Sequence, residues 1–81
     1  MREFTFTEEL IFVRPHEGQI EHVAATHYED GSVYLEGFVE RIYEGHQDCW
    51  KHALMYLSEL GFIESSIAQK QGIIPAGWNP Q

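Results

Sequence analysis

Residues 45–61 read GHQDCWKHALMYLSELG and form the one segment of the chain with a clear helical period. Its apolar residues recur every three or four positions, as on one side of an α-helix: Trp50, Ala53, Leu54, Leu57 and Leu60. Gly61 stands where a glycine commonly ends a helix, and Phe62 can fold back on Leu57 as the apolar contact of such a cap. We therefore predict one main helix over about residues 46–60, with Gly45 as its N-cap.

The segments before this helix have the composition of β-strands. Residues 2–14 alternate Phe with Thr and then run through Leu-Ile-Phe-Val, which is typical of one long strand with a bulge near Glu8-Glu9, or of two short strands. Residues 20–28 and 33–43 flank Asp30-Gly31, a strong signal for a hairpin. The pattern predicts an α+β fold, with an antiparallel sheet of three to four strands and the helix packed on one face.

A two-residue turn at Asp30-Gly31 would pair Tyr28 with Val33 and so fix which side chains share a face. The face predicted to lie under the helix holds Ile20, His22, Ala24, Thr26, Tyr28, Val33, Leu35, Gly37 and Val39. The outer face then holds Val23, Ala25, His27, Tyr34 and Phe38, set among Glu21, Glu36 and Glu40.

Residues after the helix give a weaker signal. Residues 63–71 fit a short second helix, although a strand through Phe62 to Ala68 is the alternative, and the tail from Gly72 is irregular with Trp78 as its anchor. A chain of 81 residues is too short for a second core, so we expect a single domain over residues 1–81.

The charge of the chain is strongly acidic. Thirteen Asp and Glu against five Lys and Arg give a formal net charge of −8, and residues 1–48 account for all of it. Such a balance opposes direct binding to nucleic acid, which depends on neutralising phosphates, and favours a partner with a basic surface. The single Cys forms no internal disulfide, and neither a leader-like apolar run nor a membrane-length stretch is present. We expect a cytoplasmic protein without membrane contact.

Two histidines and the only cysteine fall near the start of the predicted helix. His46 and Cys49 lie one turn apart and, with His22 from the sheet, would supply nitrogen and sulfur ligands for zinc or iron. The competing interpretation is that Cys49 is a core residue and His46 lies in water. A Cys–His nucleophile is a further reading, but no oxyanion loop accompanies it. We therefore expect neither enzymatic activity nor a cofactor.

Residues 57–70 resemble a helix-turn-helix motif in outline, with Gly61 in the turn and a Ser-rich start to the second helix. The resemblance implies transcriptional regulation as an alternative function. Leu57 departs from the motif, because it stands four positions before the glycine, where the family usually has Ala. The second helix would also carry a single basic residue, Lys70.

The predicted outer face is the preferred functional site, because exposed aromatic residues are enriched at interface centres. Its candidate partner-binding residues are Glu21, Val23, Tyr34, Glu36, Phe38 and Glu40. We predict a small non-enzymatic protein-binding module, an inhibitor or nucleic-acid mimic that occludes a basic surface. Many phage-type inhibitor proteins share its small size, its acidity and its lack of catalytic motifs. Homodimerisation stays open, as does burial of this face by residues 2–14 or the tail.

Overall fold

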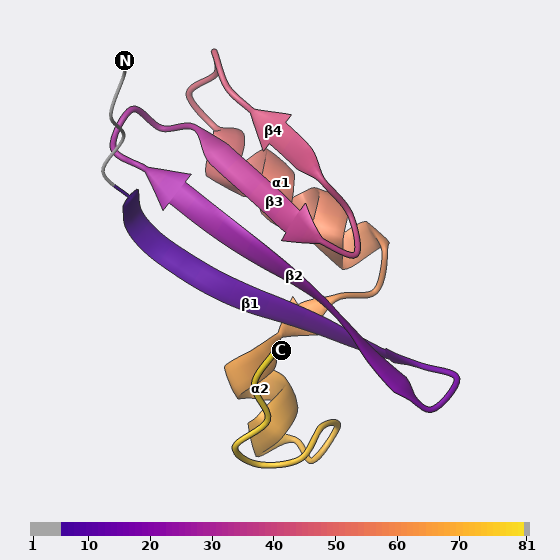
Figure 1. The fold of residues 1–81 in the computed structure, drawn as a ribbon. Coiled ribbons are helices and arrows are strands. Elements are labelled where there is room, and N and C mark those ends of the chain that lie inside the picture. Colours follow the sequence, from indigo (N-terminus) through magenta and orange to yellow (C-terminus); the bar gives the residue numbers. More distant parts are fainter. Residues whose placement is uncertain (1–5, 81) are drawn as a thin grey trace.

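The computed structural model of the chain describes residues 6–80 and shows an α+β fold (Figure 1). Its elements, in chain order, are β1 (Phe6–His16), β2 (Gln19–Tyr28), β3 (Val33–Gly37), β4 (Arg41–Tyr43), α1 (Cys49–Glu59), β5 (Ile63–Glu64) and α2 (Ser65–Lys70). The five strands form one antiparallel sheet in the order β4-β3-β2-β1-β5. The predicted fold class is confirmed, and the short strand β5 brings the sheet to five strands.

The first hairpin is long and strongly extended. Residues 2–5 of the predicted strand lie outside the described residues. From Phe6 onward β1 is one strand whose register with β2 shifts between Phe6 and Glu8, as in the single-strand alternative with a bulge. The strands are joined at Glu17 and Gly18, both of which have positive φ, 49° and 81°. This is the backbone of a two-residue turn whose twist matches that of the strands it joins.

The predicted register of the second hairpin is wrong by one residue. β2 and β3 pair His27 with Val33, and not Tyr28 with Val33. The connection is a three-residue loop over residues 29–31, closed by a 2.9 Å hydrogen bond from the Tyr28 amide to the Ser32 carbonyl. Only Gly31 in this loop has positive φ, 91°, whereas a two-residue turn of the predicted type needs it at Asp30 as well.

The local chemistry of Asp30 stabilises this longer loop. Its carboxylate accepts hydrogen bonds from the amide of Ser32 at 2.9 Å and from the hydroxyl of Ser32 at 2.6 Å. Such a side-chain contact two residues ahead closes a turn without a left-handed Asp. Because side chains alternate, the shift reverses the faces of β2 relative to the prediction.

The main core lies between α1 and the face of the sheet that carries Val23 and Ala25. Its buried members are Phe12, Val23, Ala25, Val33, Leu35, Cys49, Ala53, Leu57 and Phe62. The helix contributes Cys49, Ala53 and Leu57, which repeat every four residues and so line one side of it. In Figure 1, α1 lies behind β3 and β4.

Helix α1 begins at Cys49, three residues later than predicted, and Asp48 replaces Gly45 as its N-cap. Its C-terminus ends as predicted: Gly61 has a φ of 90°, and the Phe62 amide donates to the Leu57 carbonyl at 2.9 Å. The Gly61 amide donates to the Ser58 carbonyl, which completes a Schellman cap.

The predicted strand over residues 33–43 is broken at Gly37. This glycine has a φ of 128°, and a Cβ built on it would lie 2.5 Å from the His22 carbonyl oxygen. The close approach turns the chain, and residues 41–43 return as β4 alongside β3.

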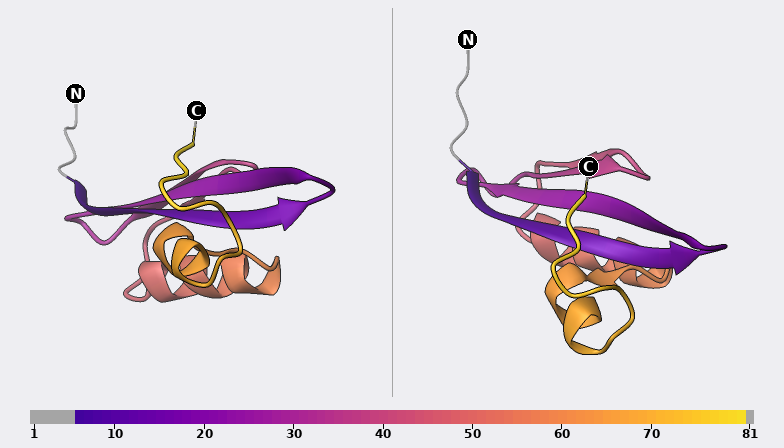
Figure 2. Two further views of the ribbon diagram at one scale, coloured as in Figure 1. Left: turned by 90° about the horizontal axis from the view of Figure 1, so that it is seen from below. Right: turned by 60° about the horizontal axis from the view of Figure 1, so that its bottom comes forward.

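Residues 63–70 adopt both of the alternatives predicted for this stretch. Ile63–Glu64 extend the sheet beside β1, and Ser65–Lys70 form a six-residue helix. On the face of β1 opposite the main core, Val13 packs with Ala68 and Ile74, joined by Trp78 from the tail. Figure 2 shows α2 and the tail beside β1, so this cover lies at the end of the sheet remote from β4.

Candidate functional site

Tyr34 and Ile42 lie side by side on the sheet face opposite α1. They are direct partners in the register of β3 and β4, and Tyr34 alternates along β3 with the buried residues Val33 and Leu35. Their exposed fractions are 38% and 57%, which are high for large apolar side chains. The ring of Tyr34 is steadied from one side by the Tyr28 ring, which meets it edge-on at 5.5 Å. The two side chains form a small apolar platform on the open face.

Carboxylates border this platform. Glu36 and Glu40 are exposed and, with Tyr34 and Ile42, line an open hollow of about 400 Å³. Within residues 6–80, neither carboxylate has an ion-pair or hydrogen-bond partner. We call Tyr34, Glu36, Glu40 and Ile42 the β3–β4 surface. Its chemistry is that of an apolar contact bordered by unpaired negative charge.

The hydrogen-bond pattern of β2 with β3 shows which way the β3 backbone points. The Phe38 amide donates to the His22 carbonyl and the Tyr28 amide to the Ser32 carbonyl, both at 2.9 Å. Bonded pairs recur at every second residue of an antiparallel ladder, so the even-numbered residues of β3 bond to β2. Its odd-numbered residues therefore face β4.

The same alternation places the backbone of Ile42 on the open edge of the sheet. Val33 and Leu35 are paired with Tyr43 and Arg41, so these two residues of β4 bond inward. The amide and carbonyl of Ile42 then point away from β3, and β4 is the last strand on that side. Among the described residues, neither group has a hydrogen-bond partner.

Arg41 also lines the hollow of the β3–β4 surface, but its guanidinium is held on the α1 side. Its guanidinium lies 4.4 Å from the ring centroid of Tyr56 in α1 and 5.4 Å from that of Tyr43. Burial raises the pKa of the Tyr43 hydroxyl above its ordinary value, and Tyr56 and Glu59 add to the rise while Arg41 opposes it. This group of side chains ties β4 to the helix.

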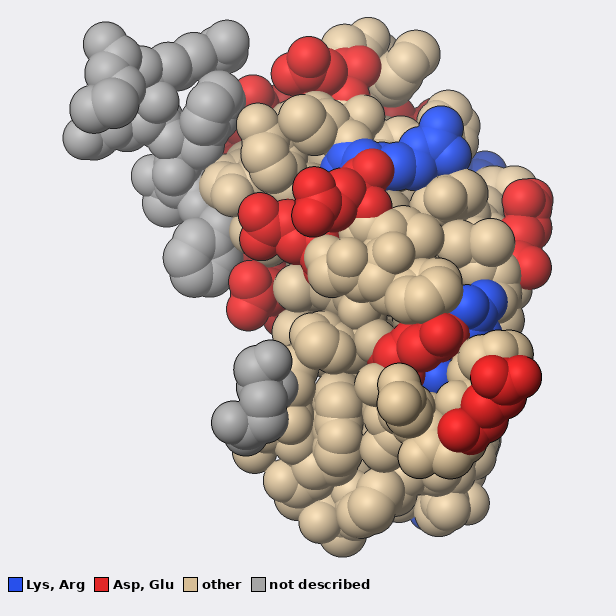
Figure 3. Space-filling view, turned by 45° about the vertical axis from the view of Figure 1, so that its right-hand side comes forward, with Lys and Arg blue, Asp and Glu red and all other residues tan. Residues whose placement is uncertain are grey.

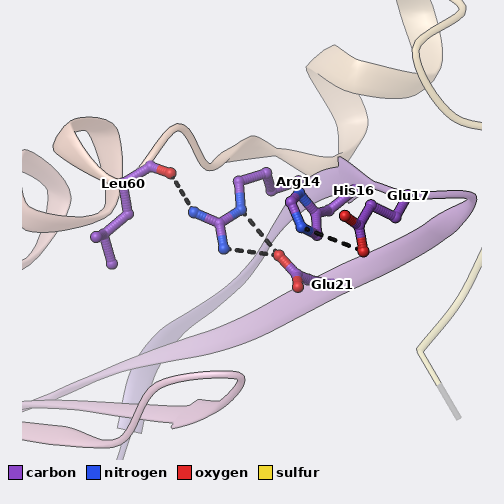
Figure 4. A network of polar contacts seen from close by, with 5 residues as sticks. All are labelled: Arg14, His16, Glu17, Glu21 and Leu60. Atoms are coloured by element: carbon purple, nitrogen blue, oxygen red, sulfur yellow. Dashed lines mark hydrogen bonds and ion pairs between the residues drawn. The ribbon is translucent and has the colours of Figure 1, made fainter.

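The distribution of charge agrees with an acidic surface. Figure 3 turns the β4 side of the molecule forward and shows Asp and Glu in several groups, separated by uncharged surface, with Lys and Arg in fewer places. The guanidinium of Arg14 pairs with the carboxylate of Glu21 at 2.7 Å, so the charge of Glu21 is already neutralised within the domain (Figure 4).

Three of the six residues predicted to bind a partner lie elsewhere than expected. Val23 is fully buried under α1, so its placement on the outer face is wrong. Phe38 is 51% exposed, but its ring does not lie beside Tyr34. It lies 5.9 Å from the ring of Phe62, a residue of the main core, and beneath the guanidinium of Arg14. Glu21 lies opposite Arg14 on β1 and is bound by its guanidinium.

The structure does not bring the predicted metal ligands together. His22 lies on the sheet face opposite α1, where its ring meets that of Trp78 at 5.9 Å. Cys49 is buried in the main core, with its thiol 3.4 Å from the His46 carbonyl oxygen. No group of three or more His, Cys, Asp or Glu within residues 6–80 is arranged to hold a metal ion.

The segment that resembles a helix-turn-helix has a different arrangement. The strand Ile63–Glu64 separates α1 from α2 and is paired with β1. The second helix has only six residues. The described part of the chain also contains no helix long and apolar enough to cross a membrane.

Ile42 is the residue of this surface that the sequence interpretation missed. It lies in residues 33–43, whose composition predicts a single strand. The signal that could have found it is Gly37, since a glycine inside a strand pattern indicates a bend or a close backbone approach. A bend there makes residues 41–43 an edge strand with Ile42 on the outer face.

No family model, no curated protein and no solved structure matches the chain.

Proposed function

We propose that the chain is a non-enzymatic protein-binding domain whose β3–β4 surface docks on a basic region of a partner protein. One observation carries the proposal: Tyr34 and Ile42 are exposed side by side, bordered by Glu36 and Glu40 without partners. Exposed aromatic and aliphatic side chains supply the apolar contact of an interface, and unpaired carboxylates select a partner of opposite charge.

The net charge of −8 supports a role for long-range attraction in the encounter. Acidic fields raise the association rate with a basic surface and do so less at higher salt. Burial of Tyr34 and Ile42 then slows dissociation, because apolar contacts gain most when water is removed from them. A partner covered in this way has its basic surface closed to other anionic ligands, nucleic acid included. In this proposal the domain is an inhibitor that acts in the cytoplasm.

Two pairs of substitutions test the location of the site. Glu36→Lys with Glu40→Lys reverses the charge of the β3–β4 surface, and Tyr34→Ala with Ile42→Ala removes its apolar part. The matched control is Glu8→Lys with Glu29→Lys, because both residues are exposed and the change in net charge is the same. Met55→Ala is the apolar control, since Met55 is 52% exposed on α1.

The measurement is capture from the protein's own cell, identification of the captured protein, and calorimetric titration of that protein at two salt concentrations. Both surface pairs are expected to weaken binding by at least about tenfold, which corresponds to about 1.4 kcal/mol. The controls are expected to change it by less than about threefold. Equal losses for the two charge pairs, or wild-type binding by Tyr34→Ala with Ile42→Ala, would overturn the proposal.

A further inference from the structure

The geometry of β4 points to the way in which a partner binds. Resting on the proposed function, we propose that an extended segment of the partner pairs with β4 as a sixth strand of the sheet. This segment carries a basic, an apolar and a basic residue at alternate positions. The proposal rests on one arrangement: the amide and carbonyl of Ile42 point away from β3 at the edge of the sheet, and the exposed residues Glu40 and Glu44 lie on either side of it.

The outer edge of β4 has main-chain hydrogen-bonding groups that are free within residues 6–80. The amide and carbonyl of Ile42 point out of the sheet and have no partner among the described residues. An edge strand in this state pairs readily with an incoming strand, which gains main-chain hydrogen bonds on binding. The opposite edge is different, because β5 has two residues and continues directly into α2.

The side chains on one face of β4 determine which residues are favoured in the incoming strand. Continuing the alternation of β4 by one residue at each end puts Glu40 and Glu44 on the same face as Ile42. An incoming antiparallel strand sets its alternate residues opposite these three, and opposite charges in such positions stabilise the pair. Lys or Arg therefore fits opposite each glutamate, and an apolar residue fits opposite Ile42.

The hollow beside β4 favours a cation at one of these positions. Glu36, Glu40 and Tyr34 line it together with Arg41, whose guanidinium lies over the ring of Tyr56 in α1. A basic side chain that enters the hollow therefore meets two carboxylates and an aromatic ring. Attraction of a cation to carboxylates and to a ring face are both favourable. The hollow therefore explains why a basic residue would be selected there over a merely polar one.

The same charges disfavour a second copy of the chain as the sixth strand. Antiparallel pairing of two β4 strands about Ile42 would set Glu40 opposite Glu44 at both ends. Each copy also brings a net charge of −8. The edge is therefore open to a basic strand and closed to self-pairing, which is how natural sheets protect an exposed edge.

A short peptide tests the mode of binding directly. The probe is an acetylated and amidated peptide of sequence TKTVTKT, titrated into the isotope-labelled full chain and followed by NMR. Chemical shifts of the Ile42 amide and its neighbours are expected to move, and exchange of the Ile42 amide proton with solvent is expected to slow. The peptide TETVTET is expected to bind at least about tenfold more weakly, and Glu40→Lys with Glu44→Lys is expected to reverse this preference.

A second peptide separates strand pairing from side-chain docking. N-methylation of the central Val removes the amide that would donate to the Ile42 carbonyl and leaves every side chain in place. Binding is expected to fall by at least about tenfold. Equal binding of the methylated peptide overturns strand addition, as does an absence of binding by TKTVTKT.

Failure of strand addition can be distinguished from failure of the proposed function. Loss of partner binding by Glu36→Lys with Glu40→Lys, together with equal binding of the methylated peptide, leaves the proposed function standing and removes only the sixth strand. A concentration-dependent dimer in sedimentation that Ile42→Lys dissociates would overturn the choice of occupant.

Discussion

The guanidinium of Arg14 on β1 donates two hydrogen bonds to one carboxylate oxygen of Glu21 on β2, at 2.9 and 2.7 Å. A third hydrogen bond runs to the Leu60 carbonyl at the C-terminus of α1, as Figure 4 shows. The same group lies 4.7 Å from the ring centroid of Phe62. One side chain thus joins two strands to the end of the helix that covers them.

Arg14→Met is expected to destabilise the fold by about 2 kcal/mol, because it removes charged hydrogen bonds and the contact with Phe62. Arg14→Lys keeps the charge but not the planar fork, so it should recover less than half of this loss. Urea unfolding of both variants gives the values. If both variants have the same unfolding free energy as the wild type, the role assigned to Arg14 is contradicted.

Gly37→Ala is expected to cost more than about 3 kcal/mol. Its Cβ would lie 2.5 Å from the His22 carbonyl oxygen, and its φ of 128° is strained for any other residue. Gly45→Ala is the control, since Gly45 also has positive φ, 77°, but a Cβ there meets nothing within 4 Å. That variant should cost about 1 kcal/mol. Thermal unfolding compares the two, and equal losses would show that the close approach to β2 is unimportant.

Leu57→Ala is expected to cost about 2–5 kcal/mol, because Leu57 is fully buried at the centre of the main core and its removal leaves a cavity. Met55→Ala, two residues away on the exposed side of α1, should change the unfolding free energy by less than about 0.5 kcal/mol. Denaturant titration measures both. A small effect at Leu57 would mean that α1 is not packed on this face of the sheet.

The raised pKa of Tyr43 predicts that the folded state loses stability at alkaline pH. Burial, with Tyr56 and Glu59, raises its pKa in the folded state above the ordinary value of about 10. The folded chain then holds this proton more tightly than the unfolded chain. Its contribution is complete below about pH 10 and is lost as the pH rises through the folded-state value.

The variant Tyr43→Phe isolates this effect. The decline in unfolding free energy between about pH 8 and about pH 10.5 is expected to be smaller in the variant than in the wild type, since Phe has no proton to lose. Urea titrations at the two pH values measure the difference. Parallel declines would show that Tyr43 ionises equally well in both states.

Local signals were sufficient for much of the fold. The apolar period of residues 50–60 predicts the buried side of α1, and Gly61 predicts its cap, because both depend on neighbours within two turns. The alternation in residues 2–14 likewise predicts strand structure there, as one long strand or two short ones. These elements are governed by contacts close in sequence.

The site was less predictable, because its position depends on one residue of register. Asp30-Gly31 is typical of a two-residue turn, but the Asp30 side chain stabilises a three-residue loop. The side chains of β2 do not distinguish the two possible registers with β3, because Ala24 and Ala25 occupy opposite faces and each face also carries a histidine. Val23 was therefore placed outside, while Tyr34, which lies on β3, keeps its predicted exposure.

The cover of Val13 has a consequence for the order in which the chain folds during synthesis. A growing chain emerges from its N-terminus, so the β1–β2 hairpin is complete long before Ala68 and Ile74, which bury Val13. Leu60, whose carbonyl binds Arg14, and strand β5 also follow the hairpin in the chain. The nascent protein therefore carries an uncovered β1 until Ala68 and Ile74 have been made, and chaperone contact is expected at β1 in that interval.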